Sequence, residues 1–224
     1  MGMTNITAIQ PREIHFRTAT NSDWLDGLGV WQAGQGGIVA GAANAGNGSL
    51  IIDAVAPQAV TGHYILSITS IEGVPRYTIE HPNGVLTPGV VGLPLNAGGI
   101  GLTLTSASGV GAKPFEIGDT FAIAILPAPI DITGIAFTLQ ARLTRTTANV
   151  ALAATSSPTD GSMPTIAVGT TGGQVAMVVP KTLMARDRLP PNTYVYDILA
   201  TAEGRTVTAF YGTIEHVDGV VFLP

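Results

Sequence analysis

The chain has 224 residues, a net charge of −5, 10 Lys and Arg residues and no cysteine. The lack of cysteine excludes disulfides, thiolate metal sites and thiol nucleophiles. So few basic residues form no basic stripe for nucleic acid and no polybasic patch for a membrane surface, so we expect neither partner. The first ten residues lack the basic and apolar regions of a signal peptide, and no apolar stretch approaches the roughly 18 residues of a membrane span.

Charged side chains are scarce. They make up 11% of the chain, against about 25% in an ordinary soluble domain. Asp26 and Asp53 enclose 26 residues without a charge, and Glu80 and Lys113 enclose another 32. A free monomer relies on charge for solubility, so this composition predicts a surface largely covered by neighbouring molecules. The alternative is a secreted or thermotolerant domain kept soluble by Thr, Ser and Asn.

Short runs of alternating apolar and polar residues, rich in Val, Ile, Thr, Tyr and Phe, predict an all-β fold. In chain order these expected strands are Ile14–Thr20, Tyr64–Thr69, Arg76–His81, Leu102–Thr105, Thr120–Ile125, Ala136–Leu143, Val175–Val179, Tyr194–Ala200 and Arg205–Glu215. Pro82–Gly84 and Ala202–Gly204 have the composition of hairpin turns. The one helical candidate is Lys181–Arg188, which two prolines end.

Two segments predict domain boundaries. Ala33–Gly48 is rich in Gly and Ala and predicts a flexible linker, or an arm that orders against a neighbour. Leu126–Pro129 predicts a stiff extended connector. Gln10–Trp31 has strand character but is too short to fold alone, so we expect it to pair with the C-terminal part of the chain. The prediction is two small antiparallel β-sandwich or barrel-like domains, with 37–126 inserted into an outer domain of 1–36 and 127–224.

The middle of the chain carries a recognisable series of turn and strand-edge motifs. They lie in Gly46–Leu50, Thr61–Ile68, Tyr77–Gly84 and Phe115–Ile123. Together they resemble the Gly-Asn-Gly-Thr…Gly-x-Tyr-x-Leu…Asp-Pro-x-Gly…Gly-Asp-x-Phe module of many tailed-phage proteins, including some head-decoration proteins. His81 stands where that pattern usually has Asp. The resemblance implies a part of a virion and implies no catalysis.

A second series lies in Pro129–Phe137, Leu139–Arg142 and Tyr194–Ile198, followed by a hairpin around Gly204 and Gly212. It resembles the N-terminal β-sandwich of phage upper-baseplate and related tail proteins. In those domains a strand directly precedes the Pro-Ile-Asp-Leu-Thr-Gly segment. Here the segment from His15 to Trp31 takes that place, before the inserted module. The two resemblances together span about four-fifths of the chain.

Several residues of this second series are expected to be scaffold. Asp131 and Thr133 can hydrogen-bond local backbone at a strand start, and Gly134 permits a bend. Tyr194 and Tyr196 alternate with Val195, so the two tyrosines are expected to share one face of the sheet. We expect Asp197 to anchor the final hairpin.

The ionisable residues show no spacing typical of a metal site or a catalytic site. His15, His63, His81 and His216 form no zinc motif and are expected to be structural. The aspartates 119, 131, 160, 187, 197 and 218 occur singly, so no glycosidase carboxylate pair is indicated. Calcium at Asp160 or Asp187 is a weaker alternative, because no acidic loop offers six oxygens.

Catalytic motifs are missing as well. The glycine clusters Gly34–Gly37 and Gly98–Gly101 lack a phosphate-binding context, and no Gly-x-Ser-x-Gly elbow occurs. The sequence therefore predicts no catalytic, cofactor-binding or metal-binding residues and no cofactor. An exposed, coplanar set among Trp24, Trp31 and Tyr211 would instead indicate sugar binding, although buried or interface tryptophans are more common.

The expectation from the sequence is a non-enzymatic bacteriophage structural protein of the tail or baseplate, assembled into a virion in the host bacterial cytoplasm. Its expected partners are copies of itself and other virion proteins. A capsid head-decoration protein is the second choice. A carbohydrate- or receptor-binding module, with a host-surface glycan as partner, is the alternative from another class, and an enzyme is third.

Overall fold

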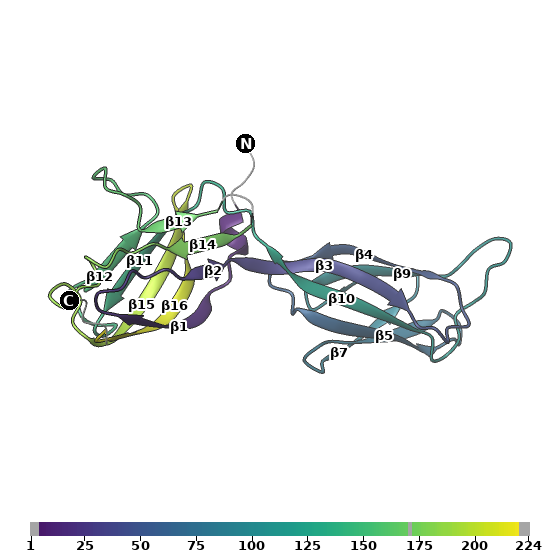
Figure 1. Cartoon of the computed structure of the whole chain (residues 1–224). Helices are drawn as coiled ribbons and strands as arrows, with labels where there is room; N and C mark the ends of the chain where they lie inside the picture. Colours follow the sequence, from purple (N-terminus) through teal and green to yellow (C-terminus); the bar gives the residue numbers. More distant parts are fainter. Residues whose placement is uncertain (1–4, 170–171, 220–224) are drawn as a thin grey trace. The chain divides into compact units, whose positions relative to one another are not determined.

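The computed structural model describes residues 5–169 and 172–219, so Met1–Thr4 of the N-terminal segment considered above lies outside the described residues. The chain forms two compact units, one of residues 1–31 and 129–224 and one of residues 32–128. We call them unit 1 and unit 2. Apart from a 3-10 turn, η1 (Asn5–Ala8), all the elements of the described residues are β-strands, which confirms the all-β fold (Figure 1).

The larger sheet of unit 1 has the strand order β1-β16-β15-β11-β12. Its strands are β1 (Arg12–Ala19), β11 (Ala136–Arg142), β12 (Leu152–Thr155), β15 (Asn192–Ala202) and β16 (Arg205–Val217). β1 runs parallel to β16, whereas the other pairs are antiparallel. The expected pairing of the N-terminal piece with the C-terminal part is therefore present, but the sheet is mixed rather than purely antiparallel.

The smaller sheet of unit 1 has the order β13-β14-β2. Its strands are β2 (Gly27–Gly29), β13 (Ile166–Val168) and β14 (Gln174–Met177). The two sheets form a sandwich whose core takes side chains such as Phe137 and Tyr196 from the larger sheet and Val175 from the smaller one. Every residue of this core cluster lies in unit 1.

Unit 2 is a second sandwich. One sheet has the order β3-β10-β5-β6-β7, from β3 (Trp31–Ala40), β5 (Gly62–Ser70), β6 (Arg76–Glu80), β7 (Leu86–Val90) and β10 (Thr120–Pro129). The other has the order β4-β9-β8, from β4 (Ser49–Val55), β8 (Pro94–Ala97) and β9 (Ile100–Thr105). Their facing side chains, including Tyr64, Leu66 and Leu104, form a core that lies wholly within unit 2.

The two boundary segments differ from expectation, because strands extend into both. The first half of Ala33–Gly48, up to Ala40, belongs to β3, which is hydrogen-bonded to β10, so a flexible linker is the wrong description of that half. Leu126–Pro129 is the end of β10 rather than a separate connector. The structure accordingly divides the chain at 31/32 and 128/129 instead of 36/37 and 126/127. The boundaries depend on which backbone groups are hydrogen-bonded to a neighbouring strand, and composition does not reveal those pairs.

The prediction of a helix at Lys181–Arg188 is also wrong. The segment is a series of hydrogen-bonded turns, with Met184 N donating to the Lys181 carbonyl and Arg188 N to the Ala185 carbonyl. Asp23 accepts a hydrogen bond from Lys181 N at 2.6 Å, which fixes the start of the segment. The buried side chains of Met184 and Leu189 anchor it to the core of unit 1. Tertiary contacts therefore overrode a weak local helix preference.

Candidate functional site

The motif residues of unit 2 close a loop around one carboxylate. Asp119 is 3% exposed and accepts hydrogen bonds from the backbone N–H groups of Ala45, Gly46 and Glu116 at 2.8 to 3.0 Å. Burial by itself raises the pKa of Asp119, but these three donors lower it more, and the net pKa shift is downward. A Cβ on Gly46 would lie 2.8 Å from the Asp119 carboxylate, so the loop needs glycine there.

Two neighbouring asparagines complete the same loop. Asn44 donates to the Thr120 carbonyl and accepts from Thr120 N, both at 2.8 Å. Asn47 accepts from Lys113 N at 2.8 Å and donates to the Gly111 carbonyl at 3.1 Å. The Gly-Asn-Gly and Gly-Asp motifs are therefore two halves of one internal clasp. The side chains of Asp119, Asn44 and Asn47 all bind backbone groups of the loop, so each has a structural role.

His81, which stands where the phage pattern has Asp, is a buried structural residue. Its Nε2 lies 2.8 Å from Thr87 Oγ1, and its ring packs on Tyr64 with centroids 5.1 Å apart. A Cβ on Gly98 would lie 2.8 Å from the imidazole. The ring thus fills a space formed by β7, Tyr64 and the turn between β8 and β9.

Each unit fixes one strand start with the same tyrosine contact. Tyr64, the third residue of β5, donates its hydroxyl to the Val60 carbonyl, and Tyr194, the third residue of β15, donates to the Pro190 carbonyl. A tyrosine that bonds backbone a few residues upstream is a stabilising corner of β-sandwiches. Tyr194 and Tyr196 are buried on one face while Val195 is less so, which confirms the predicted alternation.

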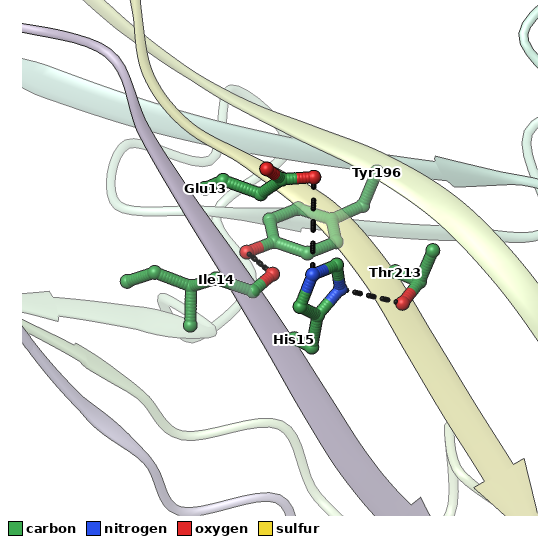
Figure 2. Close-up of polar contacts among 5 residues, drawn as sticks. All are labelled: Glu13, Ile14, His15, Tyr196 and Thr213. Atoms are coloured by element: carbon green, nitrogen blue, oxygen red, sulfur yellow. Dashed lines mark hydrogen bonds and ion pairs between the residues drawn. The ribbon is translucent and has the colours of Figure 1, made fainter.

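A polar cluster secures β1 to the sheet of unit 1 (Figure 2). The Tyr196 hydroxyl donates to the Ile14 carbonyl at 2.9 Å, and His15 Nδ1 lies 2.8 Å from Thr213 Oγ1. His15 Nε2 is also 3.8 Å from the Glu13 carboxylate. Burial, with the negative charges of Asp197 and Glu13, raises the pKa of Tyr196. The hydroxyl therefore stays protonated and acts as a donor.

His216 is buried in unit 1. Its Nδ1 lies 2.8 Å from Thr18 Oγ1, whereas Nε2 has no hydrogen-bond partner among residues 5–169 and 172–219. Burial lowers the pKa of His216, and the Met184 and Leu189 carbonyls and the Asp218 carboxylate oppose that shift only in part. The neutral imidazole is favoured, and it links β1 to β16.

The predicted scaffold residues of the second series mostly act as expected. Asp131 Oδ1 accepts Thr133 N at 3.0 Å, and Gly134 has a φ of +77° at the bend. Asp197 lies in β15 opposite Tyr211 of β16, and it is exposed in a hollow that Arg142 and Arg145 also line, so its anchoring role stays a prediction. Arg142 is itself held by the Thr147 carbonyl and the Gln140 side chain.

Two carboxylates share one open hollow of unit 1, about 430 Å³ in volume and bordered by Arg17 and Trp24. Each already accepts a structural hydrogen bond: Asp23 from Lys181 N, and Asp26 from the Trp24 indole N–H at 2.7 Å. Among residues 5–169 and 172–219, no group of three or more His, Asp or Glu residues could hold a metal ion. Within the same ranges, no helix has the length and apolarity to span a bilayer.

The aromatic set considered for sugar binding is divided. Trp24 is 3% exposed and packs edge-on against Phe16, with ring centroids 5.1 Å apart. Trp31 is 40% exposed, and its indole covers Gly29, where a Cβ would lie 1.9 Å from Nε1. Tyr211 is half-buried. Trp24 is thus a core residue and cannot form a stacking platform.

Unit 2 has few charged residues and most of the exposed large apolar side chains. It holds only 7 of the 25 charged residues, Asp53, Glu72, Arg76, Glu80, Lys113, Glu116 and Asp119, and Asp119 is buried. Of the 19 large apolar side chains that are exposed among the described residues, 12 lie in unit 2. A surface that combines these two features is typical of one that contacts other proteins.

Comparison with known proteins adds little. No protein-family model matches the chain, and neither does any curated protein. Two crystal structures of Xanthomonas campestris FlgL align with it at 22% and 20% sequence identity, each with a TM-score of 0.30. Each alignment covers 46% of this chain and 33% of the FlgL chain. A TM-score this low carries no argument about fold or function.

Proposed function

We propose that this chain is a non-enzymatic structural protein of a bacteriophage virion, a tail or baseplate component that associates with itself and docks onto other virion proteins. The observation that carries the proposal is the surface of unit 2, with few charges and many exposed apolar side chains. The motif resemblances supply the phage context. Head decoration remains the second position within the same class.

The polar groups of the molecule favour this proposal over an enzyme. The buried or clustered candidates, Asp119, His81 and His216, bind backbone or hydroxyl groups within their own unit. Asp23 and Asp26, the carboxylates that share a hollow, hold Lys181 N and the Trp24 indole. These groups stabilise the fold through hydrogen bonds, and stabilising the fold is the only role that a structural component requires of them.

Docking many copies onto a repeating particle multiplies weak contacts. When copies are held side by side, each further contact forms at a high effective concentration, so one interface need not be strong. An apolar, sparsely charged unit 2 suits such contacts, because little charge must be desolvated when its surface is covered.

The test is light scattering of the purified protein across concentration, followed by mixing with purified particles that lack it. The proposal expects a defined oligomer that sediments with those particles. Mixing with tail-less heads and with isolated tails separates the tail position from head decoration. A monomer that ignores both and binds a glycan array would contradict the proposal and support receptor binding.

A further inference from the structure

The eight edge strands of the four sheets differ in their protection against pairing with another chain. β1 carries Arg12, Glu13 and Arg17, and β4 carries Asp53 with a register shift beside it. β7 and β8 contain Pro88 and Pro94, and β2, β12 and β13 have only three or four residues. Charge, proline, irregularity and shortness are the usual devices that block edge-to-edge association.

β3 has neither the charges, nor the proline, nor the shortness that protect the other edges. It is an edge strand of ten residues, Trp31–Ala40, without a charged residue or a proline. Near its start, Ala33 N donates to the Pro57 carbonyl at 2.9 Å, so a neighbouring loop covers that part of the edge. The stretch from Gly34 to Ala40 is the longest uncharged edge in the described part of the chain.

The glycines of β3 fall into two kinds. A Cβ on Gly34 would lie 2.5 Å from the Ala128 Cβ, and one on Gly36 would lie 2.6 Å from the Ala124 carbonyl, so close packing on β10 requires both. Gly37 is exposed, and a Cβ there would meet nothing within 4 Å. Glycine weakens a strand, so a strand glycine that no packing contact within the chain requires is typical of a place where another backbone approaches closely.

The occupant that fits this edge is a second copy of the same edge. In a two-fold antiparallel pair, a strand faces its own sequence, so a charged strand meets like charges near the axis. Gly34–Ala40 contains no charge and therefore pairs with itself without repulsion. The β1 edge, with two arginines and a glutamate, lacks this property.

We propose that two copies of this protein pair through the Gly34–Ala40 edge of β3, antiparallel, so that the β3-β10-β5-β6-β7 sheets of both copies join into one sheet. This inference rests on the proposed self-association and names the strand that performs it. Backbone hydrogen bonds supply the contact, and the exposed Gln35 and Val39 side chains flank it.

The experiment is sedimentation velocity of the full chain over a wide concentration range, with the double variant Gln35→Lys/Val39→Lys. The control is Ile51→Lys/Leu86→Lys, which places the same charge on apolar residues of β4 and β7 that are 54% and 63% exposed, like Val39 at 67%. The β3 variant is expected to dissociate about tenfold more readily than the wild type, and the control to match the wild type. Circular dichroism checks that both variants are folded.

Charge complementation provides the decisive arm. Mixing Gln35→Lys/Val39→Lys with Gln35→Glu/Val39→Glu is expected to restore the wild-type dimer affinity, which neither variant reaches alone. A wild-type chain that stays monomeric, or a dimer that both double variants leave intact, would overturn the inference. So would amide exchange showing β3 protected only after particles are added, since the occupant would then be another protein.

This inference and the proposed function can fail separately. A monomeric chain that still binds particles lacking it would refute the β3 pair and keep the virion role. A dimer that the lysine variant disrupts, but that binds neither heads nor tails, would keep the β3 pair and refute the virion role.

Discussion

At the scale of single residues, several of the charged and ionisable side chains of this protein serve as internal hydrogen-bond partners. Asp119 binds three backbone N–H groups, and Asp23 and Asp131 each bind one. A carboxylate is well suited to this because its two oxygens accept several hydrogen bonds. Such bonds fix loops that lack regular structure of their own.

Asp119→Ala is expected to destabilise unit 2 by about 2 to 3 kcal/mol, because three N–H groups lose a charged acceptor. The lowered pKa of Asp119 means that its contribution is full above the pKa of the unfolded chain and is lost as pH falls through the folded value. Urea unfolding at pH 7 and at acidic pH measures both effects.

The matched control is Asp53→Ala, since Asp53 is exposed and accepts a hydrogen bond from the Thr103 hydroxyl. We expect this change to cost less than about 0.5 kcal/mol. Equal losses for the two variants would show that the clasp around Asp119 does not stabilise the loop.

His216 predicts a second pH dependence, in unit 1. Its pKa is lowered by burial below the ordinary 6.5, so the neutral form stabilises the fold fully above that value, and the stability declines as pH falls below it. The melting temperature of unit 1 is expected to drop between pH 7.5 and 5, and to drop less in His216→Gln. His63→Gln, at an exposed position in unit 2, is the control and is expected to leave the melting temperature of unit 1 unchanged.

At the scale of elements, the parallel pairing of β1 with β16 depends on Gly212. Gly212 has a φ of +151° and lies opposite Ile14, and a Cβ there would be 2.0 Å from the Ile14 carbonyl oxygen. The same oxygen accepts the Tyr196 hydroxyl. Glycine thus allows β1 to approach and tyrosine holds it in place.

Gly212→Ala is expected to destabilise unit 1 by more than about 2 kcal/mol, because the backbone must shift or β1 must separate. Tyr196→Phe is expected to cost about 1 to 2 kcal/mol, the value of one buried hydrogen bond. Gly27→Ala is the control, since a Cβ there meets nothing within 4 Å. Denaturant unfolding compares the three, and a neutral Gly212→Ala would contradict this account of β1.

At the scale of the whole molecule, the chain builds two hydrophobic cores that share no residue. We expect residues 32–128 to fold when expressed alone, because β3 and β10 are neighbouring strands and bring the two ends of the unit together. Replacing 32–128 by a short Gly-Ser linker is expected to leave unit 1 folded. Thermal melts followed by circular dichroism check both, and an unfolded isolated unit 2 would show that it depends on unit 1.

Much of the fold could be predicted from the sequence, because strand periodicity and turn chemistry are local. The alternation of Tyr194 and Tyr196 and the turns near Asn83 and Gly204 needed only neighbouring residues. The clasp could not be predicted in the same way, since Asp119 and Gly46 are 73 positions apart and only the folded chain joins them. The motif residues were visible, but their contact was not.

By itself, the sequence determined an all-β protein with few charges and no thiol chemistry, because composition and period-2 patterning act residue by residue. Tertiary structure decided what patterning leaves open: that β1 runs parallel to β16, that Ala33–Ala40 is strand rather than linker, and that Lys181–Arg188 is not a helix. Each of these depends on hydrogen-bond partners distant in sequence. A glycine-rich segment becomes a strand only when another strand pairs with it, and β10 does so here.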